Sequence, residues 1–261
     1  MRAALAALVL CLAGSPALQA QDDVPFVVTP DNVTLAMLEL ARVGPQDFVL
    51  DLGSGDGRIV ILAARRFGAR GVGVEIVPEL VERSRRNAAR AGVAERAKFV
   101  EQDLFKTDLG TATVITMYLL QEVNLQLRPS LLALKPGTRI VSHDWDMGDW
   151  RPDRSVTVAA PDKAVGLDKR SRLHLWVVPA RAEGAWCGGG ARLQLAQKHQ
   201  LFEATLSLGG SAQLLAGRIE GARLRAAGGF DAVLDGGRLR ITQPGDAPAA
   251  LAGAELERCP A

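Results

Sequence analysis

The stretch DFVLDLGSGDGR, residues 47–58, determines the fold expected for most of this 261-residue chain. It joins an apolar strand, Phe48 to Leu52, to a turn of the form Gly-x-Gly-x-Gly. Apolar residues with helical spacing follow at once, from Ile59 to Phe67. Glycine lets the backbone approach a ligand where a Cβ would clash, and the first turn of a helix offers unpaired N–H groups. This order of strand, glycine turn and helix predicts a nucleotide-cofactor site.

The spacing of the glycines, Gly53, Gly55 and Gly57, narrows the choice of cofactor. A dinucleotide fingerprint is Gly-x-Gly-x-x-Gly, which places a pyrophosphate on the helix N-terminus. Here Asp51 precedes the glycines and Asp56 lies among them, and two carboxylates would repel a pyrophosphate. They would favour the cationic amino-acid end of S-adenosylmethionine. The pattern therefore predicts S-adenosylmethionine rather than a nicotinamide cofactor.

Acidic residues end the next two predicted strands in the same way. Glu75 lies near the end of a buried-strand pattern, residues 71–76, and Asp103 follows another strand, residues 98–102. The first carboxylate can accept hydrogen bonds from both ribose hydroxyls, and the second can accept one from the adenine amino group. Any one of these acids could instead be a helix cap or a solvated strand end. Three acids at three successive strand ends favour the cofactor site.

Strand and helix patterns alternate from Val24 to about Pro179. This alternation predicts an α/β domain over residues 24–179, with a doubly wound, mostly parallel seven-strand sheet and helices on both faces. The expected later strands are Val114 to Leu119, Thr138 to Asp144, Ser155 to Ala160 and Leu173 to Val178. No helix separates the last two, so we expect an antiparallel hairpin at the sheet edge.

The composition changes after Pro179. Residues 181–190, RAEGAWCGGG, are glycine-rich and are expected to form a domain boundary. Short alternating runs broken by glycine follow, which predict a small antiparallel all-β domain over residues 190–259, either a sandwich or a half-barrel. The expected strands are Arg192 to Gln197, Leu201 to Leu208, Ala212 to Ile219, Arg238 to Thr242 and Ala254 to Arg258.

Residues 1–20 have the composition of a secretory signal peptide, with Arg2 before a short apolar run and small residues up to Ala20. An apolar N-terminal helix or a mis-chosen start codon is the alternative. Export would leave two cysteines, Cys187 and Cys259, and such a pair suggests one disulfide rather than two buried thiols. We therefore expect an exported, periplasmic protein, although S-adenosylmethionine is made in the cytosol.

Two loops at the carboxyl edge of the sheet are the candidates for acceptor binding, residues 116–124 and 142–150. Tyr118 and Trp145, with Trp150, could line a channel and contact a cation through their rings. The acids predicted to hold a cationic amine are Asp144 and Asp146, with Asp149. His143 could be a base or a structural residue. A metal site of His143, Asp144 and Asp146 is disfavoured because no second histidine or cysteine is near. The predicted catalytic residues are Tyr118, Asp144, Trp145 and Asp146, with no metal.

These segments resemble the class I, seven-strand S-adenosylmethionine-dependent methyltransferases. Within that class the chain looks most like the mitochondrial lysine methyltransferases that act on the ATP synthase c-subunit and the adenine nucleotide translocase. The resemblance covers roughly residues 26–178. The segments that carry it are TPDNVTLAML (29–38), DLGSGDGRIV (51–60), GVGVEIVPELV (71–81), DLFKTDL (103–109) and PGTRIVSHDWDMGDWRP (136–152).

The resemblance implies which residues hold S-adenosylmethionine. Those around its methionine end are Asp51, Gly53, Ser54, Gly55, Asp56 and Gly57. Glu75 would hold the ribose and Asp103 the adenine, while Thr29 and Pro30 would form a segment over the cofactor. Ile76 and Leu104, which follow the two acids, complete the predicted site.

The expected function is methyl transfer to a protein lysine or another amine. A small-molecule N- or O-methyltransferase and an exported, non-catalytic binding module on the same fold are the alternatives. The partner is then a protein or small-molecule amine, and a membrane-associated substrate fits an exported enzyme. A net charge of +2 and the lack of an Asn-Pro-Pro-aromatic loop after the fourth strand argue against a nucleic-acid substrate.

Overall fold

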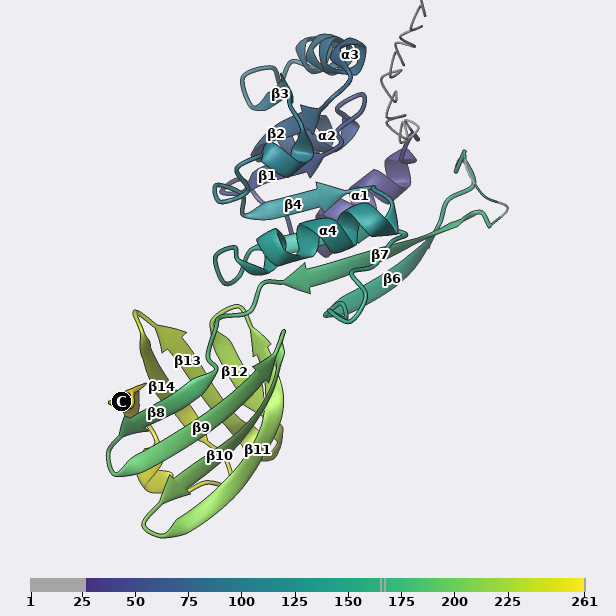
Figure 1. The fold of residues 1–261 in the computed structure, drawn as a ribbon. Helices are drawn as coiled ribbons and strands as arrows, with labels where there is room; N and C mark the ends of the chain where they lie inside the picture. Colours follow the sequence, from purple (N-terminus) through teal and green to yellow (C-terminus); the bar gives the residue numbers. More distant parts are fainter. Residues whose placement is uncertain (1–26, 165, 167, 261) are drawn as a thin grey trace, which may run out of the picture.

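The computed structural model describes residues 27–164, 166 and 168–260. Within them a sheet flanked by helices precedes a β-barrel, and the two lie end to end (Figure 1). The predicted signal peptide, residues 1–20, lies outside the described residues. No helix in the described part of the chain is long and apolar enough to cross a membrane.

Seven strands form the sheet, in the order β3-β2-β1-β4-β5-β7-β6. Their bounds are β1 Phe48–Leu52, β2 Arg70–Glu75, β3 Ala97–Glu101, β4 Val114–Met117, β5 Arg139–His143, β6 Arg154–Ala159 and β7 Arg170–Val177. The first five strands are parallel, whereas β7 runs antiparallel to both β5 and β6. This arrangement confirms the predicted doubly wound sheet and its edge hairpin.

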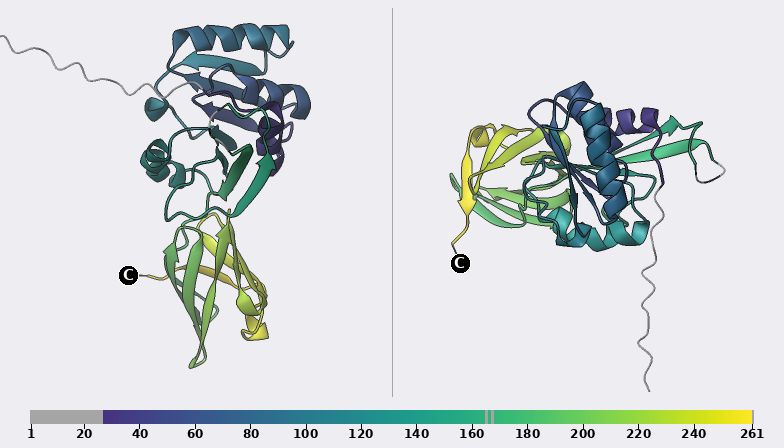
Figure 2. Two further views of the ribbon diagram at one scale, coloured as in Figure 1. Left: turned by 90° about the vertical axis from the view of Figure 1, so that its right-hand side faces the viewer. Right: turned by 90° about the horizontal axis from the view of Figure 1, so that it is seen from above.

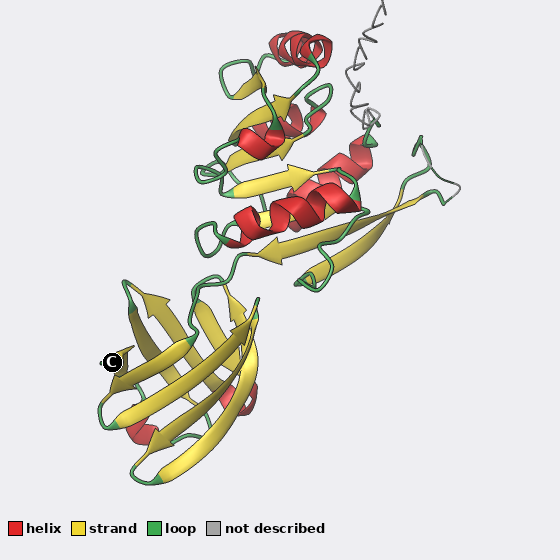
Figure 3. Ribbon diagram, in the orientation of Figure 1, coloured by secondary structure: helices red, strands yellow, loops and turns green. Residues whose placement is uncertain are grey.

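Helices cover both faces of the sheet (Figure 3). Their bounds are α1 Asp31–Leu40, α2 Arg58–Phe67, α3 Pro78–Arg90 and α4 Gln121–Leu132. Helices α1 and α2 bury apolar side chains against one face, and α3 joins α2 beside β3. Helix α4 lies on the opposite face, where Leu127 and Leu131 belong to one apolar cluster with Ile115, Met117 and Ile140.

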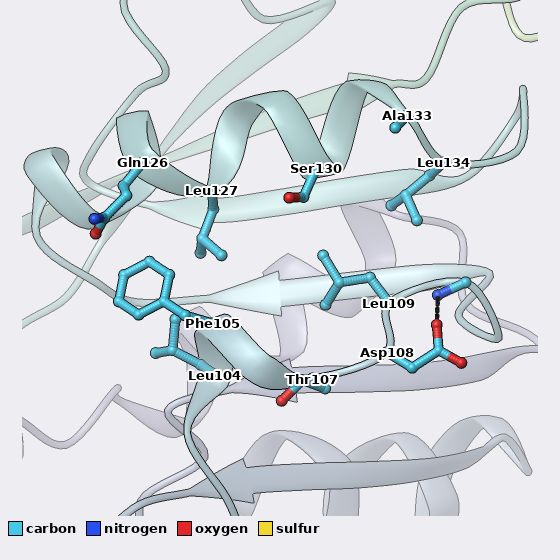
Figure 4. A pocket seen from close by; sticks show the side chains of 11 residues that line it. Leu104, Phe105, Thr107, Asp108, Leu109, Gln126, Leu127, Ser130, Ala133 and Leu134 are labelled. Atoms are coloured by element: carbon cyan, nitrogen blue, oxygen red, sulfur yellow. Dashed lines mark hydrogen bonds between the residues drawn. The ribbon is translucent and has the colours of Figure 1, made fainter.

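On the face of the sheet that carries α4, the chain connection from β3 to β4 provides little cover. The connection between these strands holds only a short 3-10 helix, η1, Leu104–Lys106, in place of a full helix. A groove of about 380 Å³ separates this connection from α4 (Figure 4). Leu104 and Phe105 line the groove on one side, and Leu127 and Leu134 line it on the other.

The C-terminal strands form a closed antiparallel barrel of eight strands. They are β8 Gly184–Gly188, β9 Ala191–Lys198, β10 Leu201–Leu208, β11 Ser211–Glu220, β12 Arg223–Ala226, β13 Phe230–Asp235, β14 Arg238–Pro244 and β15 Glu255–Arg258. Apolar side chains that include Trp186, Leu193 and Phe230 form its core. The predicted antiparallel all-β domain is confirmed, and its core is a packed apolar one.

The expectation of a sandwich or half-barrel was wrong, because the sheet closes on itself. Three strands escaped the sequence pattern, β8, β12 and β13, and the barrel begins before the boundary expected at residue 190. Glycine explains the error at β8. A Cβ on Gly188 would lie 2.2 Å from the carbonyl oxygen of Glu255, so this glycine allows β8 to approach β15 closely. A glycine-rich stretch here marks a close strand contact as well as a turn.

Strands β8 and β15 close the barrel along a short seam, with Cys187 opposite Glu257 and Trp186 opposite Arg258. A disulfide between Cys187 and Cys259 reinforces this seam, in agreement with the predicted pair. The guanidinium of Arg258 lies 4.0 Å from the centre of the Trp186 ring, which adds a cation–π contact.

The barrel lies at one end of the sheet domain (Figure 2), and the loop after β5 contacts it. Asp149 in this loop accepts a 2.5 Å hydrogen bond from Arg128 of α4. Its other carboxylate oxygen lies 3.4 Å from Nε2 of His199, in the turn between β9 and β10. The neighbouring Gln200 donates to the carbonyl of Arg151 at 2.6 Å. The position of this loop therefore depends on the barrel.

We expect the double variant Cys187→Ser/Cys259→Ser to lower the free energy of unfolding of the barrel by about 2–4 kcal/mol. The bridge closes a loop between residues that lie 72 positions apart, so its loss enlarges the entropy of the unfolded chain. Urea denaturation followed by circular dichroism checks the change. An unchanged midpoint would show that seam pairing alone stabilises the closure.

Candidate functional site

A cavity of about 590 Å³ lies at the carboxyl ends of β1 to β4, where ligands bind in sheets of this type. The predicted cofactor residues that line it are Thr29, Asp51, Gly53, Ser54, Asp56, Glu75, Ile76, Asp103 and Leu104. Pro30, Gly55 and Gly57 lie in the same segments without lining it. The structure thus brings together residues that are up to 75 positions apart, from Thr29 to Leu104.

Asp51, at the end of the central strand β1, is the most deeply buried acid of the cavity, with 2% of its surface exposed. Its carboxyl group accepts a 2.7 Å hydrogen bond from Thr116 of β4. Burial raises the pKa of Asp51 to about 7 against that hydrogen bond, and the negative charges of Glu75 and Asp56 add to the rise. A cationic ligand beside Asp51 would relieve this cost and favour the carboxylate.

Glu75 fastens the glycine turn to the end of β2. Its Oε2 accepts the N–H of Gly55 at 2.9 Å, and its Oε1 accepts the N–H groups of Ile76 and Val77 at 2.9 and 3.0 Å. A carboxylate offers about four acceptor positions, so three backbone bonds leave about one for a ligand. The expectation that Glu75 holds the ribose stays a prediction, and this carboxylate also holds the glycine turn.

Close packing brings the glycine turn onto β2. A Cβ on Gly73 would lie 2.6 Å from Oγ of Ser54, and a Cβ on Gly57 would lie 2.6 Å from the ring of Phe99. Gly57 also has a positive φ of 83°, which favours glycine. The Ser54 hydroxyl is buried without a hydrogen-bond partner among the described residues. It lies at the cavity wall, where a polar ligand could satisfy it.

Asp56 is engaged by Arg58, so it is not free to bind a cation. Two hydrogen bonds of 3.0 and 2.7 Å join the Arg58 guanidinium to the Asp56 carboxylate. Burial opposes ionisation of Asp56, but the bonds and charge of Arg58 outweigh it and lower its pKa. Arg58 also donates to the carbonyl of Thr29 at 2.7 Å, which holds the N-terminal segment over the turn. Asp51 is then the acid left for the cationic end of a ligand.

Asp103, which follows β3, lines the cavity next to η1. It caps η1 by accepting the N–H of Phe105 at 2.9 Å, and Lys106 lies 3.5 Å from its second oxygen. The cap explanation raised by the sequence is therefore correct for this residue, and the same side chain also lines the cavity. Leu104 and the half-exposed Phe105 supply apolar surface beside it, which suits a flat adenine ring.

Tyr118 is the member of the predicted catalytic set that lines the cavity. Its ring stacks on His143 with centroids 3.9 Å apart. Burial, and then the nearby charge of Asp144, raise the pKa of Tyr118. Burial lowers the pKa of His143 to about 4, and its Nε2 lies 2.7 Å from Oγ of Ser171. Both rings are neutral at pH 7, and His143 supports Tyr118 from behind instead of facing the cavity.

The expectation that Asp144 and Asp146 hold the acceptor amine does not match their contacts. Asp144 forms a 2.7 Å ion pair with Lys163, from the β6–β7 connection. Asp146 accepts hydrogen bonds from Gln121 of α4 at 3.0 Å and from the N–H of Gly148 at 2.9 Å. Neither acid lines the cavity. Lys163, which the sequence pattern could not place beside Asp144, balances the charge of that acid. Hydrogen bonds from Gln121 and Gly148 engage the carboxylate of Asp146.

The two tryptophans of this loop face different surroundings. Trp150 is fully buried, and its carbonyl accepts a 2.8 Å hydrogen bond from the indole of Trp176. Trp150 therefore belongs to the core and not to a channel. Trp145 is 41% exposed, and its carbonyl accepts a hydrogen bond from the buried Asn124 of α4. Of the two, only Trp145 is placed to meet a partner.

Several cavity residues were missed from the sequence. They are Val27, Arg58, Ile59, Val74, Val77, Pro78, Leu80, Gln102, Phe105, Leu119 and Val123. Most adjoin a predicted residue, so the position of each strand end could have indicated them. Arg58 carried a clearer signal, because a basic residue follows the glycine turn directly. No group of three metal-ligating side chains gathers within the described ranges.

These groups fit S-adenosylmethionine. Asp51 offers a buried carboxyl group to a cation, Ser54 has an unpaired hydroxyl, and Glu75 keeps about one acceptor position. Apolar side chains of Ile76 and Leu104 complete the wall.

Comparison with known proteins supports this assignment. The family model of the ANTKMT methyltransferase domain matches residues 51–154 and so ends before the barrel. The protein-lysine N-methyltransferase of Saccharolobus islandicus is 46% identical over 137 residues, which cover 52% of this chain and 85% of that protein. The human lysine N-methyltransferase of the ATP synthase c-subunit is 38% identical over 130 residues, or 49% of this chain and 55% of the relative. The chain thus spans about half the length of the animal relatives.

A solved structure agrees with the fold. An RNA methyltransferase from Salinibacter ruber, in complex with S-adenosyl-L-homocysteine, is 51% identical in sequence. The match covers 59% of this chain and 95% of that protein, with a TM-score of 0.55.

We expect the affinity for S-adenosylhomocysteine to fall by up to about tenfold per pH unit below pH 7. The pKa of Asp51 is about 7, so its carboxyl group is mostly protonated below pH 7. The cationic amino group of the ligand favours the carboxylate form, so binding at low pH requires Asp51 to lose its proton. Calorimetry between pH 5.5 and about 8.5 measures the dependence. The Asp51→Asn variant should bind weakly with a flat profile, and an unchanged slope in it would contradict the assignment.

The geometry and the relatives agree on one cofactor, since the cavity residues fit S-adenosylmethionine and the Salinibacter ruber protein holds its demethylated product. The archaeal relative shares almost half its residues with this chain over most of its own length. This protein belongs to the class I S-adenosylmethionine-dependent methyltransferases, and its residues 51–154 match the model of the ANTKMT methyltransferase domain.

Proposed function

We propose that this methyltransferase modifies lysine side chains of proteins. The observation that carries the proposal is the 46% identity to a protein-lysine N-methyltransferase, 85% of which this chain covers. The relatives named for the ATP synthase c-subunit and for the adenine nucleotide translocase act on lysine as well. The same chemistry fits an acceptor wall of Tyr118, Leu119 and Val123, which is largely apolar.

Methyl transfer to an amine needs a neutral nucleophile held in line with an electrophilic methyl group, which the bound cofactor supplies. Burial beside Leu119 and Val123 disfavours the charged form of a lysine amine and so promotes loss of its proton to water. The neutral Tyr118 ring, held by His143, can contact the amine as a ring face or through its hydroxyl. Asp51 anchors the other end of the site. Positioning therefore supplies most of the acceleration.

RNA is the second candidate acceptor, because the relative from Salinibacter ruber is described as an RNA methyltransferase. A net charge of +2 offers little general attraction to phosphate. The lysine proposal rests on several named relatives and the RNA candidate on one.

We expect the protein to incorporate labelled methyl groups into protein extracts, with mono-, di- or trimethyl-lysine found by mass spectrometry. The Asp51→Asn variant serves as the control because it loses the group that anchors the cofactor. Total RNA is assayed in parallel. Label in RNA and none in protein would replace the lysine proposal with the second candidate.

We also propose that the protein is exported and meets its acceptors, including membrane-associated ones, in the periplasm. Two observations support this: the signal-like composition of residues 1–20 and the disulfide, which persists in oxidising compartments.

The expected mature chain begins near Gln21, and intact-mass analysis of protein from the native host checks it. A chain that starts at Met1 with two free thiols would return the enzyme to the cytosol, where its cofactor is made.

A further inference from the structure

Exposed apolar side chains gather around the cofactor cavity. Among the described residues eight large hydrophobic side chains are exposed, and two of them, Leu201 and Leu214, lie on the barrel. The other six form what we call the apolar rim: Ile76, Val77, Phe105, Leu120 and Trp145, which follow strands of the sheet, and Leu125, which lies in α4 beside Gly148 of the loop after β5. Single exposed hydrophobic residues are ordinary, whereas a gathered set marks an interaction site.

The rim follows the carboxyl edge of the sheet strand by strand. Ile76 and Val77 come after β2, Phe105 after β3, Leu120 after β4 and Trp145 after β5. The exposed fractions of the six rim residues, 37% to 57%, show that each keeps substantial surface for contact.

The rim is continuous with the cofactor cavity. Ile76, Val77 and Phe105 line the cavity wall and are also exposed. Leu120 directly follows Leu119, which lines the cavity too. Figure 4 shows the Phe105 ring beside the part of α4 that carries Gln126. An acceptor that reaches the cavity from this edge must therefore pass over apolar side chains.

We propose that the apolar rim binds the segment of the partner protein that carries the methylated lysine, and that it favours lysines flanked by large apolar side chains. The proposal rests on the lysine function proposed above. The continuity of the rim with the cavity favours a protein segment as the occupant, because the segment can lie along the rim while its lysine side chain enters the cavity.

Leu120 offers a clean substitution. It is the N-cap residue of α4 and makes no side-chain cap bond, while serine is among the preferred N-cap residues. Leu120→Ser therefore removes apolar surface without weakening the helix. Leu125→Ser, within α4, is a second rim variant. Leu214→Ser is the matched control, because Leu214 is 83% exposed on β11 of the barrel.

The experiment compares two labelled peptides of equal length, each with one lysine, flanked by leucine in one and by serine in the other. Fluorescence anisotropy measures their binding to the protein loaded with S-adenosylhomocysteine, and mass spectrometry follows methylation separately. We expect the wild-type protein and Leu214→Ser each to bind the leucine-flanked peptide about tenfold more tightly than the serine-flanked peptide, a difference in binding free energy of about 1.4 kcal/mol. Leu120→Ser and Leu125→Ser should lose most of this preference and retain S-adenosylhomocysteine affinity.

Binding and methylation distinguish the two proposals. A leucine preference in binding without methylation of either peptide would keep the rim and refute lysine as the acceptor. Equal binding of the two peptides by the wild-type protein would refute the proposed role of the rim. An equal loss of the leucine preference in Leu214→Ser and in the rim variants would refute it as well. Sedimentation with phosphatidylcholine vesicles and the oligomeric state in solution test the other occupants. If Leu120→Ser reduced vesicle binding or self-association and left the peptide preference intact, the rim would serve a bilayer or a second copy instead.

Discussion

Asp51 ends the central strand β1 with its carboxyl group buried close to two other acids, Asp56 and Glu75. Three negative charges buried close together would repel one another, and each of the three acids is stabilised in a different way. Arg58 pairs with Asp56, backbone N–H groups occupy most of Glu75, and burial raises the pKa of Asp51 to about 7. The last carboxyl group is therefore left for a cationic ligand.

The same contacts assemble the rest of the cavity. Glu75 joins the glycine turn to the end of β2, and Arg58 joins that turn to the segment of Thr29. These links bring parts of the wall from separate stretches of the chain into fixed relative positions. Because the links are hydrogen bonds of buried or partly buried groups, the loss of one partner would leave another unsatisfied.

The loop after β5, which carries Trp145 of the apolar rim, depends on a different set of contacts. The loop after β5 is held from α4 by Arg128 and Asn124 and from the barrel by His199 and Gln200. The barrel thus helps to position this loop, although the barrel lies outside the region matched by the family model. A disulfide between Cys187 and Cys259 reinforces the seam that closes this barrel.

Local patterns in the sequence determined the strands of the sheet, the glycine turn and the acids at the strand ends, because each depends on residues that are neighbours in the chain. The disulfide also followed from counting, since the predicted loss of residues 1–20 would remove Cys11 and leave a single pair of cysteines. Only the tertiary structure decided which acids are free. Lys163, in the β6–β7 connection, neutralises Asp144. The pairing of Asp56 with Arg58 is local by contrast, so the sequence could have indicated it. Barrel closure was equally hidden, because Gly188 serves a contact with Glu255 that lies far along the chain. The Lys163–Asp144 pair and the close approach at Gly188 arise between residues that are distant in the chain, so no local pattern contains them.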